Sequence, residues 1–231
     1  MTVAAEDADV EMRDRLIEAT LDHIPFDGWS ELALSAGACD SEFSLNEANH
    51  LFPAGTSDMI QHFSGWADRR MIAGLGAVDL SEMRTHERVT IAVELRLEGL
   101  EAHKEAVRRG LSWLMMPQNT IFGVRLLYRT VDDIWYAVGD RSADFSFYTK
   151  RGLLAGVVGS TTLFWLDDDS DGGVKTSEFL DRRIAEVMRI HSARRRSEAV
   201  KTKMPNPLRI LRDVAQKRYG SVRTMGDSRL T

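Results

Sequence analysis

One short stretch of the sequence has the spacing of a calcium site. In "LDDDSDGGVKTSEF", carboxylates occupy the first, third, fifth and twelfth positions of an EF-hand pattern, at Asp167, Asp169, Asp171 and Glu178. Gly172 stands at the sixth position, where such a loop needs its sharp turn. Side chains at this spacing can surround one hard cation with oxygen ligands. However, EF-hands usually occur in pairs, whereas this chain offers one such loop, and Asp and Gly are also ordinary turn residues.

Residues able to carry catalysis do not cluster elsewhere in the sequence. The histidines form neither an HExxH nor a paired Glu-x-x-His pattern, and no glycine-rich phosphate loop is present. The single Cys39 cannot form an internal disulfide. We therefore predict a protein that is not an enzyme and that uses no cofactor and no catalytic metal.

Composition and hydropathy indicate a globular protein. A chain of 231 residues with 43 % hydrophobic content is long enough to bury one core. The longest apolar stretch, residues 152–166, falls short of the roughly 18 to 20 residues that cross a bilayer. Because the acidic start "MTVAAEDADVEM" has the features of neither a signal peptide nor a transit peptide, a cytoplasmic location is expected.

The elements that position these residues are expected to be helices. Proline is rare, and long proline-free segments with apolar residues at helical spacing favour an all-α fold. Ser30 is a candidate N-cap for a short helix that ends at Gly37, and Asp40 or Ser41 is a candidate N-cap for the next one. With a first helix that stops before Pro25, these two predict a helix-turn-helix unit. Later helices are expected at about 57–75, 81–98, 101–115, 118–138, 143–166, 174–198 and 207–219.

The chain is accordingly divided into four parts. The expected boundaries place a disordered tail at 1–10, a three-helix unit resembling a helix-turn-helix at 11–55, a helical ligand-binding domain at 56–198, and a basic linker with an amphipathic helix at 199–231.

The charge distribution argues against DNA binding by the helix-turn-helix unit. A unit of this kind followed by a larger helical body is the plan of TetR-type repressors. Between Arg15 and Arg69 the chain has no Lys or Arg, whereas that stretch contains nine Asp or Glu residues. Helix-turn-helix proteins gain affinity by neutralising phosphates with basic side chains. We therefore expect no nucleic-acid partner, and we keep a TetR-type ligand-responsive transcriptional regulator as the alternative function.

Several irregular sequence blocks carry a family resemblance. The blocks "VDDIW", "GDRSADFSFYTKR", "TTLF" and "FLDRRI" resemble the lipid-binding accessory family of ubiquinone biosynthesis, the ninth Coq protein. The resemblance implies a TetR-like fold that has lost DNA binding, a homodimer, and an apolar pocket for isoprenoid lipids or quinone intermediates. It also implies a partner, the di-iron demethoxyubiquinone hydroxylase, to which these intermediates would be presented.

The resemblance also assigns lipid-binding residues. The family's lipid-contacting arginine falls on Arg151, with Lys150 and Leu154 beside it. An arginine at the rim of an apolar cavity can pair with a phosphate or another polar headgroup. An ordinary surface salt bridge is the other interpretation of Arg151.

A partner-binding patch is implied at Asp132, Ile134, Trp135 and Phe147. An aromatic and an aliphatic side chain beside an acid make a plausible interface hot spot. The family generally has Trp at the position of Phe147. For Trp135, burial in the core explains the residue as well as an interface does.

The segment "GLLAGVVGSTTLFWL" is apolar around the whole helix, which predicts a helix buried on all sides. Gly152, Gly156 and Ser160 recur at four-residue spacing, so another backbone can approach closely. The segment is expected at a dimer seam, beside the pocket, or in tight packing within one subunit.

The end of the chain is strongly basic. Residues 182–231 contain fourteen Lys or Arg against four acids. In "NPLRILRDVAQKRYG" the apolar side chains share one half of a helical wheel, among them Leu208, Leu211, Val214 and Ala215. Such a helix suits an anionic membrane surface, and docking on the body of the protein is the alternative. We expect peripheral association with the inner face of the membrane; a calcium-responsive interaction protein remains the second alternative function.

Overall fold

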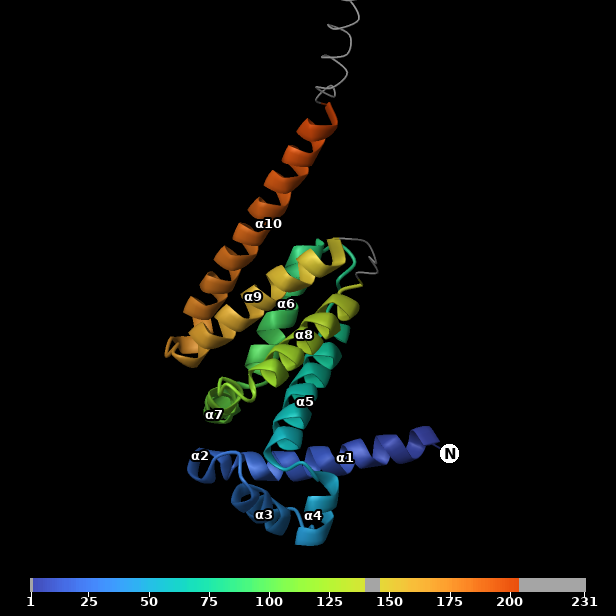
Figure 1. Ribbon diagram of the computed structural model, residues 1–231, viewed down its shortest axis with the longest axis vertical. Coiled ribbons are helices and arrows are strands. Elements are labelled where there is room, and N and C mark those ends of the chain that lie inside the picture. The colour runs from blue at the N-terminus through green and yellow to red at the C-terminus, as the bar shows by residue number, and fades with distance from the viewer. Residues whose placement is uncertain (1, 140–145, 204–231) are drawn as a thin grey trace, which may run out of the picture. The chain divides into compact units, whose positions relative to one another are not determined.

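The computed structural model describes the backbone of residues 2–139 and 146–203. Over these ranges the chain is helical and contains no strand, which confirms the all-α prediction (Figure 1). The α-helices are α1 (Thr2–Leu21), α2 (Ile24–Asp27), α3 (Glu31–Asp40), α4 (Leu45–Leu51), α5 (Thr56–Gly76), α6 (Thr85–Glu98), α7 (Lys104–Leu114), α8 (Thr120–Ala137), α9 (Ser146–Leu166) and α10 (Val174–Lys203). Two short 3-10 helices, η1 (Glu101–His103) and η2 (Asp171–Gly173), precede α7 and α10.

The chain divides into two compact units, residues 1–184 and residues 185–231. The first unit contains both the predicted three-helix unit at 11–55, called the three-helix start from here on, and the helical body that follows it, which were predicted as separate parts. In the structure the three-helix start also contains the single-turn helix α2 between α1 and α3. The second unit is described as the later turns of α10, as far as Lys203. The predicted disordered tail at 1–10 is wrong from Thr2 onward, because α1 begins there. No glycine or proline interrupts this segment, so the helix can propagate through it.

Helix α3 packs against α1 at a very small separation. Its N-cap is Ser30, as predicted, and the Ser30 hydroxyl accepts a hydrogen bond from the Ala33 amide at 3.3 Å. The predicted end at Gly37 is wrong, since α3 continues to Asp40. Gly37 is buried, and a Cβ atom there would lie 2.6 Å from the Thr20 backbone. The glycine therefore permits a close helix crossing and does not end the helix.

Helix α4 begins later than the sequence indicated. Its N-cap is Ser44, which forms a capping box with Glu47. The Ser44 amide donates to the Glu47 carboxylate at 2.8 Å, and the Glu47 amide donates to the Ser44 hydroxyl at 3.2 Å. The predicted cap at Asp40 or Ser41 is wrong because α3 extends through Asp40 and because Glu42 turns the chain with a φ of 63°.

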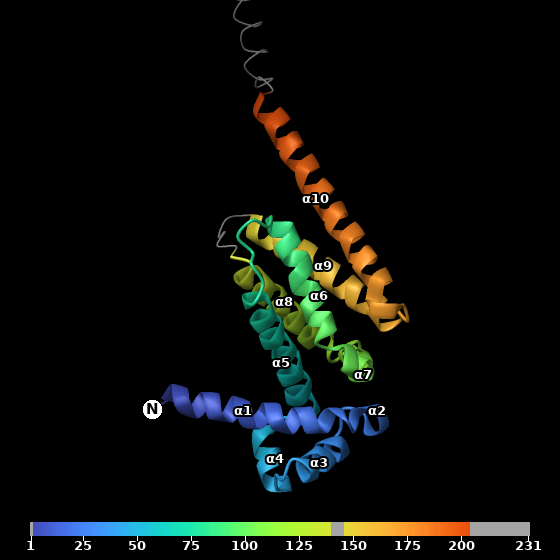
Figure 2. The same ribbon diagram turned by 180° about the vertical axis from the view of Figure 1, so that it is seen from behind.

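Helix α5 is central to the first unit. Near its start it contacts α1, and along its length it lies beside α6 and α8 (Figures 1 and 2). Helix α8 packs in turn against α9. The side chains that α5 contributes to the core share one face, and they include Met59, Ile60, Phe63, Ala67, Met71 and Leu75.

Polar contacts join α1 to α5. The Asp14 carboxylate is hydrogen-bonded to His62 Nε2 at 2.6 Å and accepts a hydrogen bond from Arg69 Nη2 at 2.5 Å. The Glu18 carboxylate accepts a hydrogen bond from Trp66 Nε1 at 3.0 Å. Burial lowers the pKa of His62, although the contact with Asp14 opposes this shift. These bonds fix the three-helix start to the helical body.

Helix α9 is only partly buried within one chain, so burial on all sides stays a prediction that requires a second subunit. Leu154, Val157 and Val158 face the core, whereas Gly152 and Gly156 are exposed. The exposed positions of α9 among the described side chains are Gly152, Gly156 and Leu163, and none of them is polar, so hydropathy alone did not separate the two faces. None of the helices in the described ranges has the length and apolarity needed to cross a membrane.

Candidate functional site

An apolar cavity of about 490 Å³ lies within the first unit. Helices α5, α6, α7, α8 and α9 all contribute side chains to it, and Trp29 joins them from the segment before α3. The apolar lining is formed chiefly by Trp29, Ile60, Phe63, Ala67, Leu100, Ala106, Val107, Leu111, Leu114, Met115, Val124, Leu126, Leu127 and Val158. A volume in the range of roughly 300 to 1,000 Å³ is typical of small-molecule pockets.

The cavity reaches the surface beside the connection between α7 and α8. Among its lining residues, Met115 is 72 % exposed and Val124 is 51 % exposed, whereas Leu100 and Ala106 are buried. Ile121, on the same turn of α8 as Val124, is also exposed. The opening is therefore flanked by apolar side chains that water contacts.

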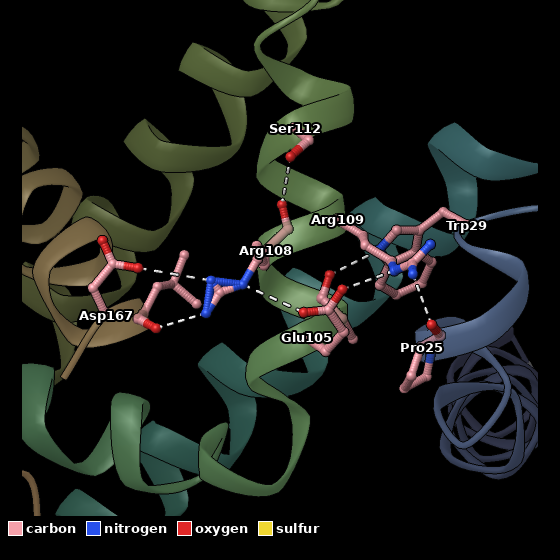
Figure 3. Close-up of polar contacts among 9 residues, drawn as sticks. Pro25, Trp29, Glu105, Arg108, Arg109, Ser112 and Asp167 are labelled. Atoms are coloured by element: carbon pink, nitrogen blue, oxygen red, sulfur yellow. Dashed lines mark hydrogen bonds and ion pairs between the residues drawn. The ribbon is translucent and has the colours of Figure 1, made fainter. Parts of the chain in front are cut away.

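Helix α7 forms one wall of the cavity and is fastened to the three-helix start. The Trp29 indole N–H donates to the Ala106 carbonyl at 2.9 Å, and Arg109 Nη2 donates to the Pro25 carbonyl at 2.7 Å (Figure 3). Arg109 is itself held by Glu105, at 2.9 Å. Trp29 thus contributes both a wall and a support of the cavity.

On its other side α7 is bonded to the end of α9. Arg108 Nη2 donates to the Leu166 carbonyl at 2.7 Å, and its guanidinium lies 3.8 Å from the Asp167 carboxylate (Figure 3). The last carbonyl groups of a helix lack intrahelical partners, so an arginine is a favourable donor at this point. These contacts hold α7 in place across the space that the cavity occupies.

A polar cluster joins the cavity wall to the core. Arg96 lines the cavity, and its Nε donates to Asp68 Oδ1 at 2.7 Å. Thr130, another lining residue, donates to Asp68 Oδ2 at 2.9 Å. The Asp68 side chain is 3 % exposed and the Arg96 side chain is 12 % exposed. The cavity thus has an apolar lining with one charged, hydrogen-bonded point.

The predicted lipid-binding residues are not among those that line this cavity. Arg151 pairs with Asp132, which joins α9 to α8. The Lys150 ammonium lies 5.7 Å from the centre of the Trp135 ring, within the range of a cation–π contact. Leu154 is buried at 3 % exposure. Arg151 therefore has the geometry of the salt-bridge interpretation, and its role in lipid binding stays a prediction.

The predicted partner-binding residues divide between surface and core. Asp132 is exposed, whereas Ile134 is fully buried. Trp135 is half-buried, and its indole N–H has no hydrogen-bond partner among the described residues. The side chain of Phe147 lies outside the described residues. The structure brings Asp132 and Trp135 together with Lys150 and Arg151 in one surface cluster, which the sequence had assigned to two separate sites.

The predicted membrane-docking residues Leu208, Leu211, Val214 and Ala215 lie outside the described residues. Their role stays a prediction.

The acidic loop is organised by its own hydrogen bonds. Asp168, which the EF-hand pattern does not use, is buried and accepts hydrogen bonds from the amides of Ser170 and Thr176, at 2.9 Å each, and from the Thr176 hydroxyl at 2.6 Å. The pKa of Asp168 lies far below its usual value. Hydrogen bonds from the side chains of Ser170 and Thr176 are the largest cause, and the bonds from their amides add to the effect. Within the described ranges, no three His, Cys, Asp or Glu side chains are grouped to hold a metal ion.

Two residues of the polar cluster, Arg96 and Asp68, were not predicted from the sequence as site residues. Arg96 follows Val89, Ala92 and Val93 at helical spacing, so it occupies the buried stripe of α6. Asp68 interrupts the buried face of α5 in the same way. Opposite charges on the core-facing stripes of two helices are a signal for a buried ion pair, and this signal was available in the sequence.

Comparison with known proteins identifies related sequences. Residues 121–191 match the COQ9 family model. The chain is 32 % identical over 198 residues to the mitochondrial ubiquinone biosynthesis protein COQ9 of Rattus norvegicus, covering 81 % of this chain and 62 % of that protein. It is 31 % identical to the Homo sapiens protein, over 81 % of this chain and 61 % of that protein. The probable coq9 of Dictyostelium discoideum is 26 % identical over 78 % of this chain and 60 % of that protein.

The chain spans about three fifths of the length of these curated relatives. Among solved structures, a TetR transcriptional regulator from Nitrosomonas europaea superposes with a TM-score of 0.63 at 20 % identity, covering 77 % of this chain and 98 % of that one. At this level of identity the likeness concerns the fold, and it confirms the TetR-like architecture. The chain is therefore similar to the COQ9 proteins over most of its length, as the family resemblance predicted, and the region that matches their family model lies on a TetR-like helical fold.

Proposed function

We propose that this protein is a non-catalytic accessory protein of ubiquinone biosynthesis that binds isoprenoid lipids or quinone intermediates in its apolar cavity. It presents them to the di-iron demethoxyubiquinone hydroxylase. The cavity of about 490 Å³ is the observation that carries the proposal. The relatives named as ubiquinone biosynthesis proteins support the pathway.

The chemistry of the lining suits a prenyl tail. Transfer of apolar surface from water into an apolar site is favourable by about 25 cal/mol per Å². Most of the cavity lining is aliphatic or aromatic, and polar groups are few. A hydrocarbon tail can therefore bury its surface here without leaving buried polar groups unpaired.

Delivery requires a surface as well as a cavity. Met115, Ile121 and Val124 expose apolar side chains beside the opening. Asp132 and Trp135 lie further along the same helix, α8, where the family resemblance implies a partner-binding patch. In this proposal the basic end of the chain docks at the inner face of the membrane, two copies form a homodimer, and the hydroxylase is bound through α8.

Native mass spectrometry of the purified protein tests lipid binding, with lipid extracted and identified after denaturation. Gly159 lines the cavity, and a Cβ atom there would meet Leu127 at an ordinary 3.7 Å. We expect Gly159→Leu to occupy cavity volume and to reduce the bound lipid. Gly76→Leu is the matched control, because Gly76 ends α5 with no atom within 4 Å of its Cβ position. Absence of prenyl lipid from the unmodified protein, even after incubation with prenylated quinone, would reject the proposal.

A further inference from the structure

Arg96 gives the cavity a defined polar point. Among the described residues that line the cavity, Arg96 is the one with a charged side chain. Ser64 and Thr130, both lining residues, lie within its hydrogen-bonded cluster. A ligand with a polar head and an apolar tail therefore finds donors at one place and hydrocarbon elsewhere.

The position of the Arg96 guanidinium is fixed by its partners. Nε donates to Asp68 Oδ1 at 2.7 Å, and Nη2 donates to the Ser64 hydroxyl oxygen at 3.4 Å. Asp68 is held in turn by Thr130 from α8. Three helices thus orient one guanidinium before any ligand binds, which reduces the entropy that binding would otherwise cost.

Donors remain on this guanidinium for a ligand. Arginine carries more N–H groups than the bonds to Asp68 and Ser64 use. The Ser64 hydroxyl accepts from Arg96, so its own proton can be donated as well. The cluster presents hydrogen-bond donors to the cavity, and a headgroup that complements it must offer acceptor oxygens.

The charge of the cluster selects among acceptors. Asp68 already neutralises Arg96, because the two form a direct ion pair in a buried position. A carboxylate or phosphate ligand would add an anion to this neutral pair, and burial of an uncompensated charge is strongly unfavourable. A carbonyl or hydroxyl oxygen accepts the same hydrogen bonds without that cost.

We propose that Arg96, held by Asp68, is the headgroup-binding residue of the cavity and that the pair selects neutral oxygen acceptors, such as quinone carbonyls, over anionic headgroups. The inference rests on the proposed function, since it concerns the same cavity. It assigns the headgroup to a different arginine from Arg151, and it gives Asp68 the role of setting the charge preference.

Two probes with similar isoprenoid tails test the charge preference: 2-geranyl-1,4-benzoquinone, which is neutral, and geranic acid, which is anionic near neutral pH. Binding of each is measured by calorimetry at constant pH and salt. We expect the unmodified protein to bind the quinone about tenfold more tightly than the acid, a ratio that one hydrogen bond to a charged group can support. Equal affinities, or tighter binding of the acid, would overturn the inference.

The variant Asp68→Asn should reverse this preference. It keeps the size of the side chain but leaves the positive charge of Arg96 without its carboxylate, so geranic acid should become the tighter ligand. Glu98→Gln is the matched control, because Glu98 is exposed on α6 two residues from Arg96 and does not line the cavity. The double variant Asp68→Asn with Arg96→Gln leaves no buried charge unpaired, and it should bind the quinone about tenfold more weakly than the unmodified protein.

The outcomes separate this inference from the proposed function. If neither probe binds the unmodified protein, both fall together. If both bind, but Asp68→Asn leaves their ratio unchanged in a protein with native circular dichroism, the charge-selecting role is wrong and the lipid-binding cavity stands. Reversal in Asp68→Asn, without reversal in Glu98→Gln, supports the role assigned to the pair.

Discussion

Replacement of Gly37 by alanine tests whether the three-helix start depends on a close helix crossing. A Cβ atom at this position would lie 2.4 Å from the Thr20 hydroxyl oxygen and 2.6 Å from the Thr20 backbone nitrogen and Cα. The hydroxyl could rotate away, but the backbone atoms belong to α1 and cannot move alone. The two helices must therefore separate, and the buried contacts around Leu16 and Leu34 must loosen.

The sign of the effect follows from two opposing contributions. Gly37 lies inside α3, where alanine would be favoured over glycine by about 0.8 to 1.0 kcal/mol from helix propensity alone. Overpacking of a close-packed site typically costs about 1 to 3 kcal/mol, and a clash between backbones lies at the upper end of this range. We expect net destabilisation of about 1 to 2 kcal/mol, which corresponds to a fall in Tm of roughly 2 to 8 °C for a chain of this size.

Chemical denaturation followed by circular dichroism measures this change. Gly65→Ala is the control, because Gly65 lies inside α5 and its Cβ would meet only the flexible end of Arg69, at 3.5 Å. That variant should be as stable as the unmodified protein or up to about 1 kcal/mol more stable. Stabilisation by both substitutions would refute the close crossing of α1 and α3.

Other predictions concern pH, assembly, membrane docking and calcium. Burial lowers the pKa of His103 in the folded protein, so the free energy of unfolding should fall as the pH drops below about 6.5, and His103→Gln should flatten this dependence in pH-resolved melting curves. A Cβ atom at Gly156 would have no other atom within 4 Å in one subunit, so the Gly156→Leu variant should fold normally. It should weaken the predicted dimer in sedimentation analysis, and an unchanged dimer would place the seam elsewhere. Truncation after Lys203 should abolish co-sedimentation with anionic vesicles, and retained binding would reject the basic helix as the docking element. Calcium titration should give no binding isotherm, because Asp168 already organises the loop; binding that Glu178→Gln removes would contradict this.

The sequence predicted the helical order well because helix signals are local. Apolar spacing and N-caps such as Ser30 depend on residues within a few positions, and they gave most helices to within a few residues. One error arose where a distant contact decides. Gly37 looks like a helix end, but Thr20 of another helix explains it. The turn before α4 depends on the positive φ of Glu42, and a glutamate does not predict a positive φ.

The candidate site was less predictable because its parts are distant in the sequence. The ion pair of Arg96 with Asp68 joins residues 28 positions apart, and Thr130 completes it from a third helix. The local signal was a charge on an apolar stripe, which does not reveal its partner. The family resemblance assigned Asp132, Trp135 and Arg151 to sites that stay predictions, and it did not predict that Arg151 pairs with Asp132.

The three-helix start has a structural role, since it helps to form and support the cavity. Trp29 forms part of the cavity wall, and its indole N–H donates a hydrogen bond to the Ala106 carbonyl of α7. Asp14 and Glu18 bond α1 to α5, the helix that carries Asp68. Loss of these helices would therefore open the cavity and remove a support of its polar point.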